Sequence, residues 1–205
     1  MHPEASSTDR LLVATGNLGK ARELAQLLSD APCRLLTLRD VGIDADVEET
    51  GATLEENATI KARAYAGMSG LWTMADDSGL EVDALGGAPG HLSKRFAGEG
   101  ASDQQLVQRL LERLQGVPWA RRTARFRCVI ALAAPQGRVR LYHGQCPGII
   151  ALEPSGDQGF GYDPVFFFPE LERTMAELSM AEKNAVSHRA LAARGLAQAL
   201  KKESA

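Results

Sequence analysis

The sequence predicts a single α/β domain over residues 10–205, arranged as two lobes around a cleft. An apolar run at residues 10–15 is followed by a glycine-containing turn and by helical spacing of leucines at residues 20–28, which together form an α/β unit. A later apolar run at residues 71–76 predicts a buried strand, and the alanine- and leucine-rich stretch at 182–201 predicts a helix. At 205 residues the chain can bury a substantial core.

The other elements follow from caps and breaks. Thr53-Leu54-Glu55-Glu56 is a capping-box pattern and predicts a helix that runs to about Ala66. Ser102–Leu114 has the apolar spacing of an amphipathic helix, and Pro135-Gln136-Gly137 predicts a hairpin turn. The remaining expectations are a possible hairpin partner at 80–85, a loop at 86–90, and strands at 123–133, 138–144, 148–152 and 164–168.

Composition restricts the class of protein. The apolar fraction of 44% and the charged fraction of 24% are typical of soluble globular domains. A formal net charge of −3 argues against nucleic-acid binding as the main role, and no apolar run is long enough to span a membrane. Cys33, Cys128 and Cys146 are widely spaced and favour reduced thiols over a zinc site. Residues 1–9 lack the features of a signal peptide, so we expect a mobile tail and a cytoplasmic protein.

Two adjacent carboxylates, Asp76 and Asp77, end an apolar run and precede Ser78 and Gly79. Burying acids costs free energy unless they are paired, hydrogen-bonded or bound to a metal. The pair therefore indicates a cation site or a general base. An ordinary surface turn is the alternative, because Asp, Ser and Gly also form turns.

The junction between a predicted strand and a predicted helix has the sequence Thr15-Gly16-Asn17-Leu18-Gly19-Lys20. Helix N-termini present free N–H groups that suit phosphate, and Thr15, Asn17 and Lys20 can add side-chain donors. It is not a Walker A loop, since the spacing differs and no Ser or Thr follows Lys20. A plain turn with a surface lysine is the alternative.

Acidic residues at Glu48 and Glu49 precede the capped helix, in which Asn57 and Lys61 share one face. A solvated helix start explains Glu48 well and Glu49 less well. The segment Gly159–Pro164 places two aromatic residues between glycines, which suits a platform for a flat base, although an aromatic pair filling the core is the alternative.

The segment Glu182–Arg189 gathers Lys183, His188 and Arg189. In a continuous helix Lys183 and His188 would point in different directions. A helix break near Asn184–Ser187, with Ser187 as the cap of the last helix, would let them converge. An exposed charged helix face is the alternative.

Six segments in order along nearly the whole chain resemble the inosine triphosphate pyrophosphatase family of noncanonical purine nucleoside triphosphate pyrophosphatases. Six motifs in order are far more specific than one, so the functional interpretations are favoured over the structural ones. The matching segments are TGNLGK (15–20), EETG (48–51), ENATIKAR (56–63), ADDSGLEVDALGGAPG (75–90), GFGYDPVF (159–166) and EKNAVSHR (182–189).

The resemblance implies a long central mixed β-sheet flanked by helices, with two lobes around a nucleotide-binding cleft. It implies a homodimer that hydrolyses ITP, dITP and XTP to the monophosphate and pyrophosphate and so keeps them out of DNA and RNA. It also implies a magnesium cofactor, with Glu49 and Asp77 as ligands and Asp77 as the general base. The implied substrate-binding residues are Thr15, Gly16, Asn17, Leu18, Gly19, Lys20, Lys61 and Ser78 on the phosphate side, and Phe160, Gly161, Tyr162, Asp163, Lys183, His188 and Arg189 on the base and sugar side.

The implied chemistry is physically consistent. Asp77 would deprotonate a water for attack at the α-phosphorus, while the metal and the lysines stabilise the developing charge. Hypoxanthine and xanthine carry an acceptor at the 6-position, where adenine carries a donor. A donor such as Arg189 or a backbone N–H would leave adenine mispaired, at a cost of about 1–3 kcal/mol.

Three alternatives remain. A related pyrophosphatase could prefer modified pyrimidine or other damaged nucleotides. A catalytically silent nucleotide-binding module has no need of a water-activating acid such as Asp77. Nucleic-acid binding through the arginines at 121–127 is disfavoured by the net charge. One departure from the family pattern, His91-Leu92 where we expect a tyrosine, affects only the detail of that loop.

Overall fold

The structure of the chain is a computed structural model that describes residues 9–203, so the tail predicted over residues 1–9 lies almost entirely outside the described residues. The chain divides into two compact units. Of the described residues, unit 1 contains 9–77, Cys128–Gly144 and 189–203. Unit 2 contains Ser78–Arg127 and Gln145–His188.

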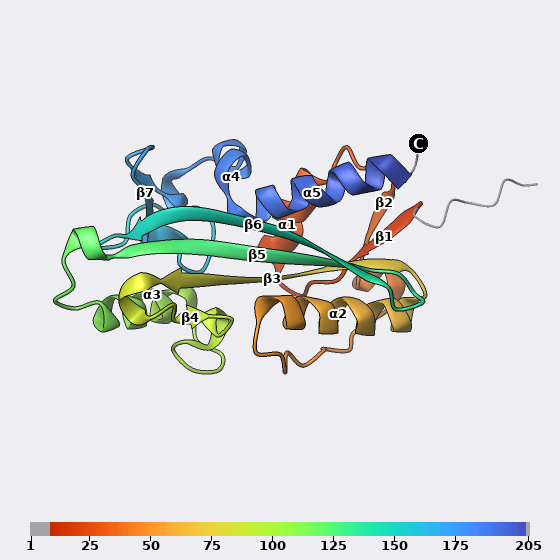
Figure 1. Cartoon of the computed structure of the whole chain (residues 1–205), viewed down its shortest axis with the longest axis horizontal. Helices are drawn as coiled ribbons and strands as arrows, with labels where there is room; N and C mark the ends of the chain where they lie inside the picture. The colour runs from red at the N-terminus through yellow and green to blue at the C-terminus, as the bar shows by residue number, and fades with distance from the viewer. Residues whose placement is uncertain (1–8, 204–205) are drawn as a thin grey trace, which may run out of the picture. The chain divides into compact units, whose positions relative to one another are not determined.

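Helices and strands alternate from β1 to β3, whereas strands β5 to β8 follow one another and the chain ends in two helices (Figure 1). The helices are α1 (Leu18–Leu27), α2 (Leu54–Ser69), α3 (Asp103–Arg113), α4 (Met180–Val186) and α5 (His188–Glu203). The strands are β1 (Arg10–Val13), β2 (Arg34–Thr37), β3 (Trp72–Val82), β4 (Pro89–Gly90), β5 (Thr123–Ala133), β6 (Val139–Ile150), β7 (Phe166–Phe168) and β8 (Arg173–Thr174).

The strands form a mixed sheet in the order β2-β1-β3-β5-β6-β7-β8, and β4 pairs with β3. Strand β1 is parallel to β2 and β3, whereas β3–β4, β6–β7 and β7–β8 are antiparallel. This arrangement confirms the predicted α/β class with a central mixed sheet flanked by helices.

In unit 1, alternate residues of the strands face different helices. Leu11 packs in one cluster with Leu24 of α1 and Leu196 of α5. Its neighbour Leu12 packs in another cluster with Ala58 of α2. Side chains alternate between the two faces of a strand, so α2 covers one face of this part of the sheet, and α1 and α5 cover the other (Figure 1).

In unit 2, the core contains aromatic residues from β5 and β7 together with the apolar face of α3. The rings of Phe126 and Phe166 lie 4.6 Å apart between centroids, and Leu110 of α3 is fully buried in the same cluster. A capping box at Ser102 and Gln105 begins α3 one residue inside the predicted helix.

Two strand predictions are wrong in detail. The expected strands at 71–76 and 80–85 are one strand, β3, because Gly79 continues the extended chain where β4 passes. A Cβ at Gly79 would lie 2.3 Å from the carbonyl oxygen of Gly90, so only glycine permits this approach. The strand expected at 148–152 is the end of β6. The helical stretch expected at 182–201 consists of α4 and α5, which are divided at the predicted break.

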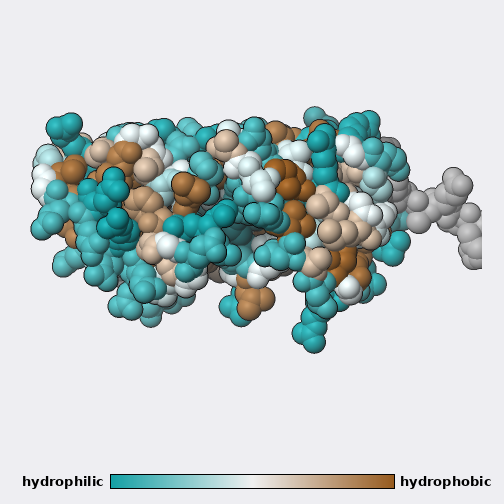
Figure 2. Space-filling view, turned by 90° about the horizontal axis from the view of Figure 1, so that it is seen from below, coloured by the Kyte–Doolittle hydropathy of each residue, from teal (hydrophilic) through white to brown (hydrophobic). Residues whose placement is uncertain are grey.

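Hydrophilic and hydrophobic residues are interspersed on the face of the molecule that Figure 2 shows. Among residues 9–203, none of the helices combines the length and the apolar composition that crossing a bilayer requires.

Candidate active site

The turn before α1 is built by two local hydrogen bonds. The Asn17 side chain caps the helix by accepting from the Lys20 N–H at 3.0 Å, and the Thr15 hydroxyl accepts from the Asn17 N–H at 3.2 Å. The first turn of α1 contains no acidic residue, so the partial positive charge of the helix end is not neutralised locally. Leu18 is exposed and a Cβ at Gly16 would meet nothing within 4 Å, so the turn is open to a ligand.

Asp76 of β3 is buried among cations. Its Oδ2 atom lies 3.0 Å from the Lys20 ammonium and accepts a hydrogen bond from Arg189 Nε at 3.4 Å. Burial acts to raise the pKa of Asp76, but the charges of Lys20 and Arg189 hold that pKa well below its usual range. Asp76 is therefore ionised and fixes the position of Lys20 beside the turn.

Asp77, the next residue of β3, has different surroundings. Its Oδ2 accepts from the Asn57 amide at 3.2 Å, and its Oδ1 lies 4.0 Å from the Lys61 ammonium. Burial raises the pKa of Asp77 above its usual value, although the charges of Lys61 and Lys20 act in the opposite direction. Two adjacent carboxylates thus have pKa values shifted in opposite directions, which is typical of sites with acid–base chemistry.

The Lys61 ammonium joins the helix α2 to two acidic segments. It donates to Glu49 Oε1 at 2.5 Å and to the carbonyl oxygen of Asp76 at 2.7 Å. Burial acts to lower the pKa of Lys61, but the charges of Asp77 and Asp76 raise it above its usual value. The structure therefore brings Glu49, Lys61 and Asp77 together in unit 1, whereas Glu48 is exposed.

These residues fit a magnesium ion that arrives with phosphate. Within residues 9–203 there is no group of three or more His, Cys, Asp and Glu residues that could hold a metal. Magnesium is, however, commonly bound by one or two carboxylates together with substrate phosphates. Glu49 and Asp77 supply two carboxylates, and the Lys61 ammonium between them shows that the position accepts a cation.

Glu23 of α1 was not predicted as a site residue. Its carboxylate is buried and accepts a hydrogen bond from Arg189 Nη1. Glu23 precedes an apolar helix face, and the sequence carries no signal that it turns inward to meet a residue far along the chain. Arg189 is 2% exposed between Glu23 and Asp76, while its predicted contact with the base stays a prediction.

Unit 2 brings together three residues predicted on the base side. Asp163 Oδ2 accepts from the Phe160 N–H at 2.9 Å and from the Lys183 ammonium at 2.5 Å. The same ammonium lies 4.9 Å from the centroid of the Phe160 ring. Lys183 and Asp163 are buried, whereas Phe160 is half-buried, so the ring is supported by a fixed ion pair.

The neighbouring residues of this loop are also anchored. Gly161 donates its N–H to Asp103 at 2.7 Å, and the buried Tyr162 hydroxyl donates to the Ser93 carbonyl at 2.8 Å. Burial raises the pKa of Tyr162 above its usual value. Asp103 and Ser93 were not predicted as anchors of this loop, because they lie far from it in sequence.

His188 lies inside unit 2. Its ring stacks on Phe126 at 4.7 Å, and Nδ1 lies 3.9 Å from the Cys146 sulfur. The predicted helix break is confirmed at Ser187, whose extended backbone separates α4 from α5. Lys183 and His188 are both buried, and Ser78 at the start of unit 2 is half-buried.

Three of the four arginines at 121–127 bond acids or backbone carbonyls. Arg125 and Arg127 pair with Glu81 at 2.7 and 2.9 Å, and Arg125 also reaches Asp83 at 3.2 Å. Arg122 is buried and donates to the backbone carbonyls of Val117, Ala151 and Leu114. The guanidinium groups of these three arginines therefore already bond acids or carbonyls, which disfavours a nucleic-acid-binding surface here.

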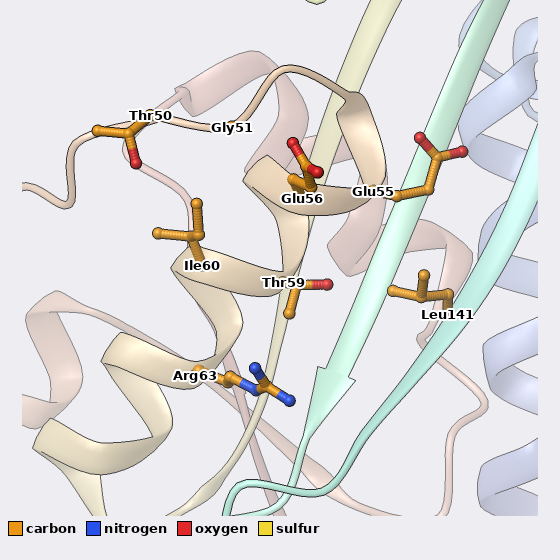
Figure 3. Close-up of a pocket in the computed structure, with 8 residues that line it drawn as sticks. All are labelled: Thr50, Gly51, Glu55, Glu56, Thr59, Ile60, Arg63 and Leu141. Carbon is orange, nitrogen blue, oxygen red and sulfur yellow. The ribbon is translucent and has the colours of Figure 1, made fainter.

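A pocket of about 470 Å³ lies in unit 1, between α2 and β6 (Figure 3). Glu55, Thr59 and Arg63 follow one another at four-residue spacing on α2, and Leu141 lies on β6. None of the predicted site residues is among the residues that line it. The pocket is therefore separate from the cluster around Lys61.

Comparison with known proteins places the chain in a family. Residues 11–199 match the model of the Ham1 family. A dITP/XTP pyrophosphatase from Shigella flexneri is 50% identical over 194 residues, which cover 94% of this chain and 98% of that protein. A dITP/XTP pyrophosphatase from Geobacter sulfurreducens is 52% identical over 180 residues, which cover 88% and 90%.

Solved structures agree with this placement. A HAM1 protein from Coxiella burnetii has a TM-score of 0.86 and 42% identity, and the match covers 94% of this chain and 98% of that one. The Ham1 protein from Staphylococcus aureus has a TM-score of 0.84 and 40% identity, covering 95% and 99%. The chain, with the buried acid pair of β3 and the capped turn before α1, therefore belongs to the Ham1 family.

Proposed function

We propose that this protein hydrolyses noncanonical purine nucleoside triphosphates, namely dITP, ITP and XTP, to the monophosphate and pyrophosphate. The Ham1 match and relatives named dITP/XTP pyrophosphatase support the reaction class. The observation that carries the mechanism is the cluster in unit 1, where two carboxylates with opposite pKa shifts lie beside Lys20 and Lys61. Removal of these nucleotides would keep them out of DNA and RNA.

Asp77 is the proposed general base. Its raised pKa makes the carboxylate a better proton acceptor than an exposed aspartate, and the Asn57 amide fixes its orientation. It takes a proton from water, whose oxygen forms a bond to the α-phosphorus as the bond to the bridging oxygen breaks. Pyrophosphate leaves with that bridging oxygen.

The other residues of unit 1 hold the triphosphate. The N–H groups at the start of α1, the Thr15 and Asn17 side chains and the Lys20 ammonium are positioned to contact phosphate oxygens. Lys61 neutralises charge that develops on the phosphates. Magnesium, when held by Glu49 and Asp77, would supply further charge neutralisation for the leaving pyrophosphate.

Unit 2 supplies the proposed base-binding residues. Phe160 offers a ring that a purine can stack on, and Asp163 and Lys183 hold that ring in place. Because Arg189 is enclosed between two carboxylates, we propose that it positions Asp76 and that another donor reads the 6-oxo group. We further propose that the protein acts as a homodimer in the cytoplasm.

A substrate panel tests the proposal. Pyrophosphate release is measured for XTP, dITP, ITP, ATP, GTP and dTTP with Mg²⁺, for the wild type, Asp77→Asn and the exposed control Asp30→Asn. Activity on the first three nucleotides that is lost only in Asp77→Asn supports the proposal. Equal activity on all six nucleotides would contradict the proposed selectivity for noncanonical purines. Full activity of Asp77→Asn would contradict the assignment of Asp77 as the general base.

A further inference from the structure

The Lys61 ammonium lies among oxygen atoms of the kind that bind a divalent cation. Its nitrogen lies 2.5 Å from Glu49 Oε1, 2.7 Å from the Asp76 carbonyl oxygen and 4.0 Å from Asp77 Oδ1. The Lys61 side chain is 14% exposed, so its charge is poorly screened by water. The geometry is that of a cation site whose cation is the protein's own ammonium group.

This arrangement has an electrostatic cause. Glu49 and Asp77 both face Lys61, and their negative charges would repel each other without a cation between them. A positive charge at this place stabilises both carboxylates. Lys61 or a metal ion can provide that charge, but a carboxylate oxygen that receives a short bond from the ammonium is not available to a metal in the same direction.

We propose that Lys61 is a placeholder for the divalent cation. Its ammonium bonds Glu49 Oε1, and this bond must break before a metal can bind that oxygen. This inference rests on the function proposed above and adds how metal and nucleotide binding depend on each other. A triphosphate gives the displaced ammonium new acceptors, so nucleotide and metal each favour the binding of the other.

If Lys61 is such a placeholder, replacing it should affect phosphate binding and metal binding in opposite directions. Replacing Lys61 by methionine removes a phosphate-binding charge, yet it should strengthen binding of the metal to the nucleotide-free protein. Lys20→Met is the matched control, because Lys20 is also a half-buried lysine near the acid pair but bonds Asp76 and not Glu49. Both variants lose one positive charge, and only one of them releases Glu49.

The experiment is a calorimetric titration of Mn²⁺, and then Mg²⁺, into nucleotide-free wild type, Lys61→Met and Lys20→Met. We expect Lys61→Met to bind the metal about tenfold more tightly than Lys20→Met, the effect of removing one competing charge-assisted hydrogen bond. Thermal melts establish that each variant is folded. Equal affinities in the two variants, or no measurable binding in either, would overturn the proposal.

A second measurement uses the wild type alone and does not depend on a substitution. Acylation of Lys61 by an amine-reactive ester, followed by mass spectrometry, should increase when Mg²⁺ is added without nucleotide, because the displaced ammonium becomes accessible. The exposed Lys94 is the internal control and should not change. Constant acylation of Lys61 at metal saturation would contradict the proposal. If XTP hydrolysis is normal while these results are negative, the placeholder fails and the proposed function stands; an inactive wild type overturns the function instead.

Discussion

Replacing Arg189 by methionine should destabilise unit 1 strongly, because it removes the cation that two buried carboxylates share. The guanidinium is 2% exposed, donates to Glu23 and lies 3.4 Å from Asp76 Oδ2. A unit charge pair at that distance interacts by about 5 kcal/mol at an effective dielectric constant of about 20. Desolvation of the ions offsets part of this, and removing one partner of a buried pair costs about 3–5 kcal/mol in general. We expect the free energy of unfolding to fall by about 3–5 kcal/mol.

Urea unfolding followed by circular dichroism at pH 7 measures this loss. Arg194→Met is the control, since Arg194 is exposed on the same helix, and we expect a change within about 0.5 kcal/mol. Adding Glu23→Gln to Arg189→Met should recover part of the loss, because one buried charge is then removed. An Arg189→Met variant within about 1 kcal/mol of the wild type would refute the argument that this ion cluster is a closed, buried unit.

Three further predictions concern other parts of the chain. Gly79→Ala should lower the melting temperature and disrupt the pairing of β3 with β4, since its Cβ would lie 2.3 Å from the Gly90 carbonyl oxygen; unchanged melting would contradict this. Asp103→Ala should raise KM for XTP several-fold with little change in kcat, because the loop that carries the proposed base platform loses an anchor, and Asp103→Asn should retain most of the affinity; equal effects on KM and kcat would argue against a positioning role. Hydrogen bonds, chiefly from Arg173, lower the pKa of Glu182 to about 2, so its stabilisation is present above its ordinary value of 4.5 and is lost as the pH falls toward 2. Melting curves of Glu182→Gln should therefore differ from the wild type at pH 7 and converge with it near pH 2.

Local sequence signals predicted the parts of the fold that depend on local interactions. The capped helix α2, the amphipathic helix α3 and the break at Ser187 follow from caps and apolar spacing, which act within a few residues. The continuity of β3 through Gly79 was not predicted. It depends on the backbone of Gly90, a contact between residues that the local pattern does not connect.

In the candidate site, too, contacts between residues distant in sequence were not predicted from local patterns. The grouping of Glu49, Lys61 and Asp77 was implied by the family resemblance, and the structure gives its geometry. Glu23 and Asp103 were missed because each acts on a residue far along the chain, at separations of 166 and 58 residues. An acid near an apolar helix face carries no sign of its partner until the fold brings the two together.

The most direct test of the account is pyrophosphate release from XTP by the wild type and by Asp77→Asn at the same Mg²⁺ concentration. We expect steady release by the wild type and a loss of at least about a hundredfold in kcat for the variant, as for a removed general base. Comparable kcat values in the two proteins would contradict the assignment of Asp77 and with it the proposed mechanism.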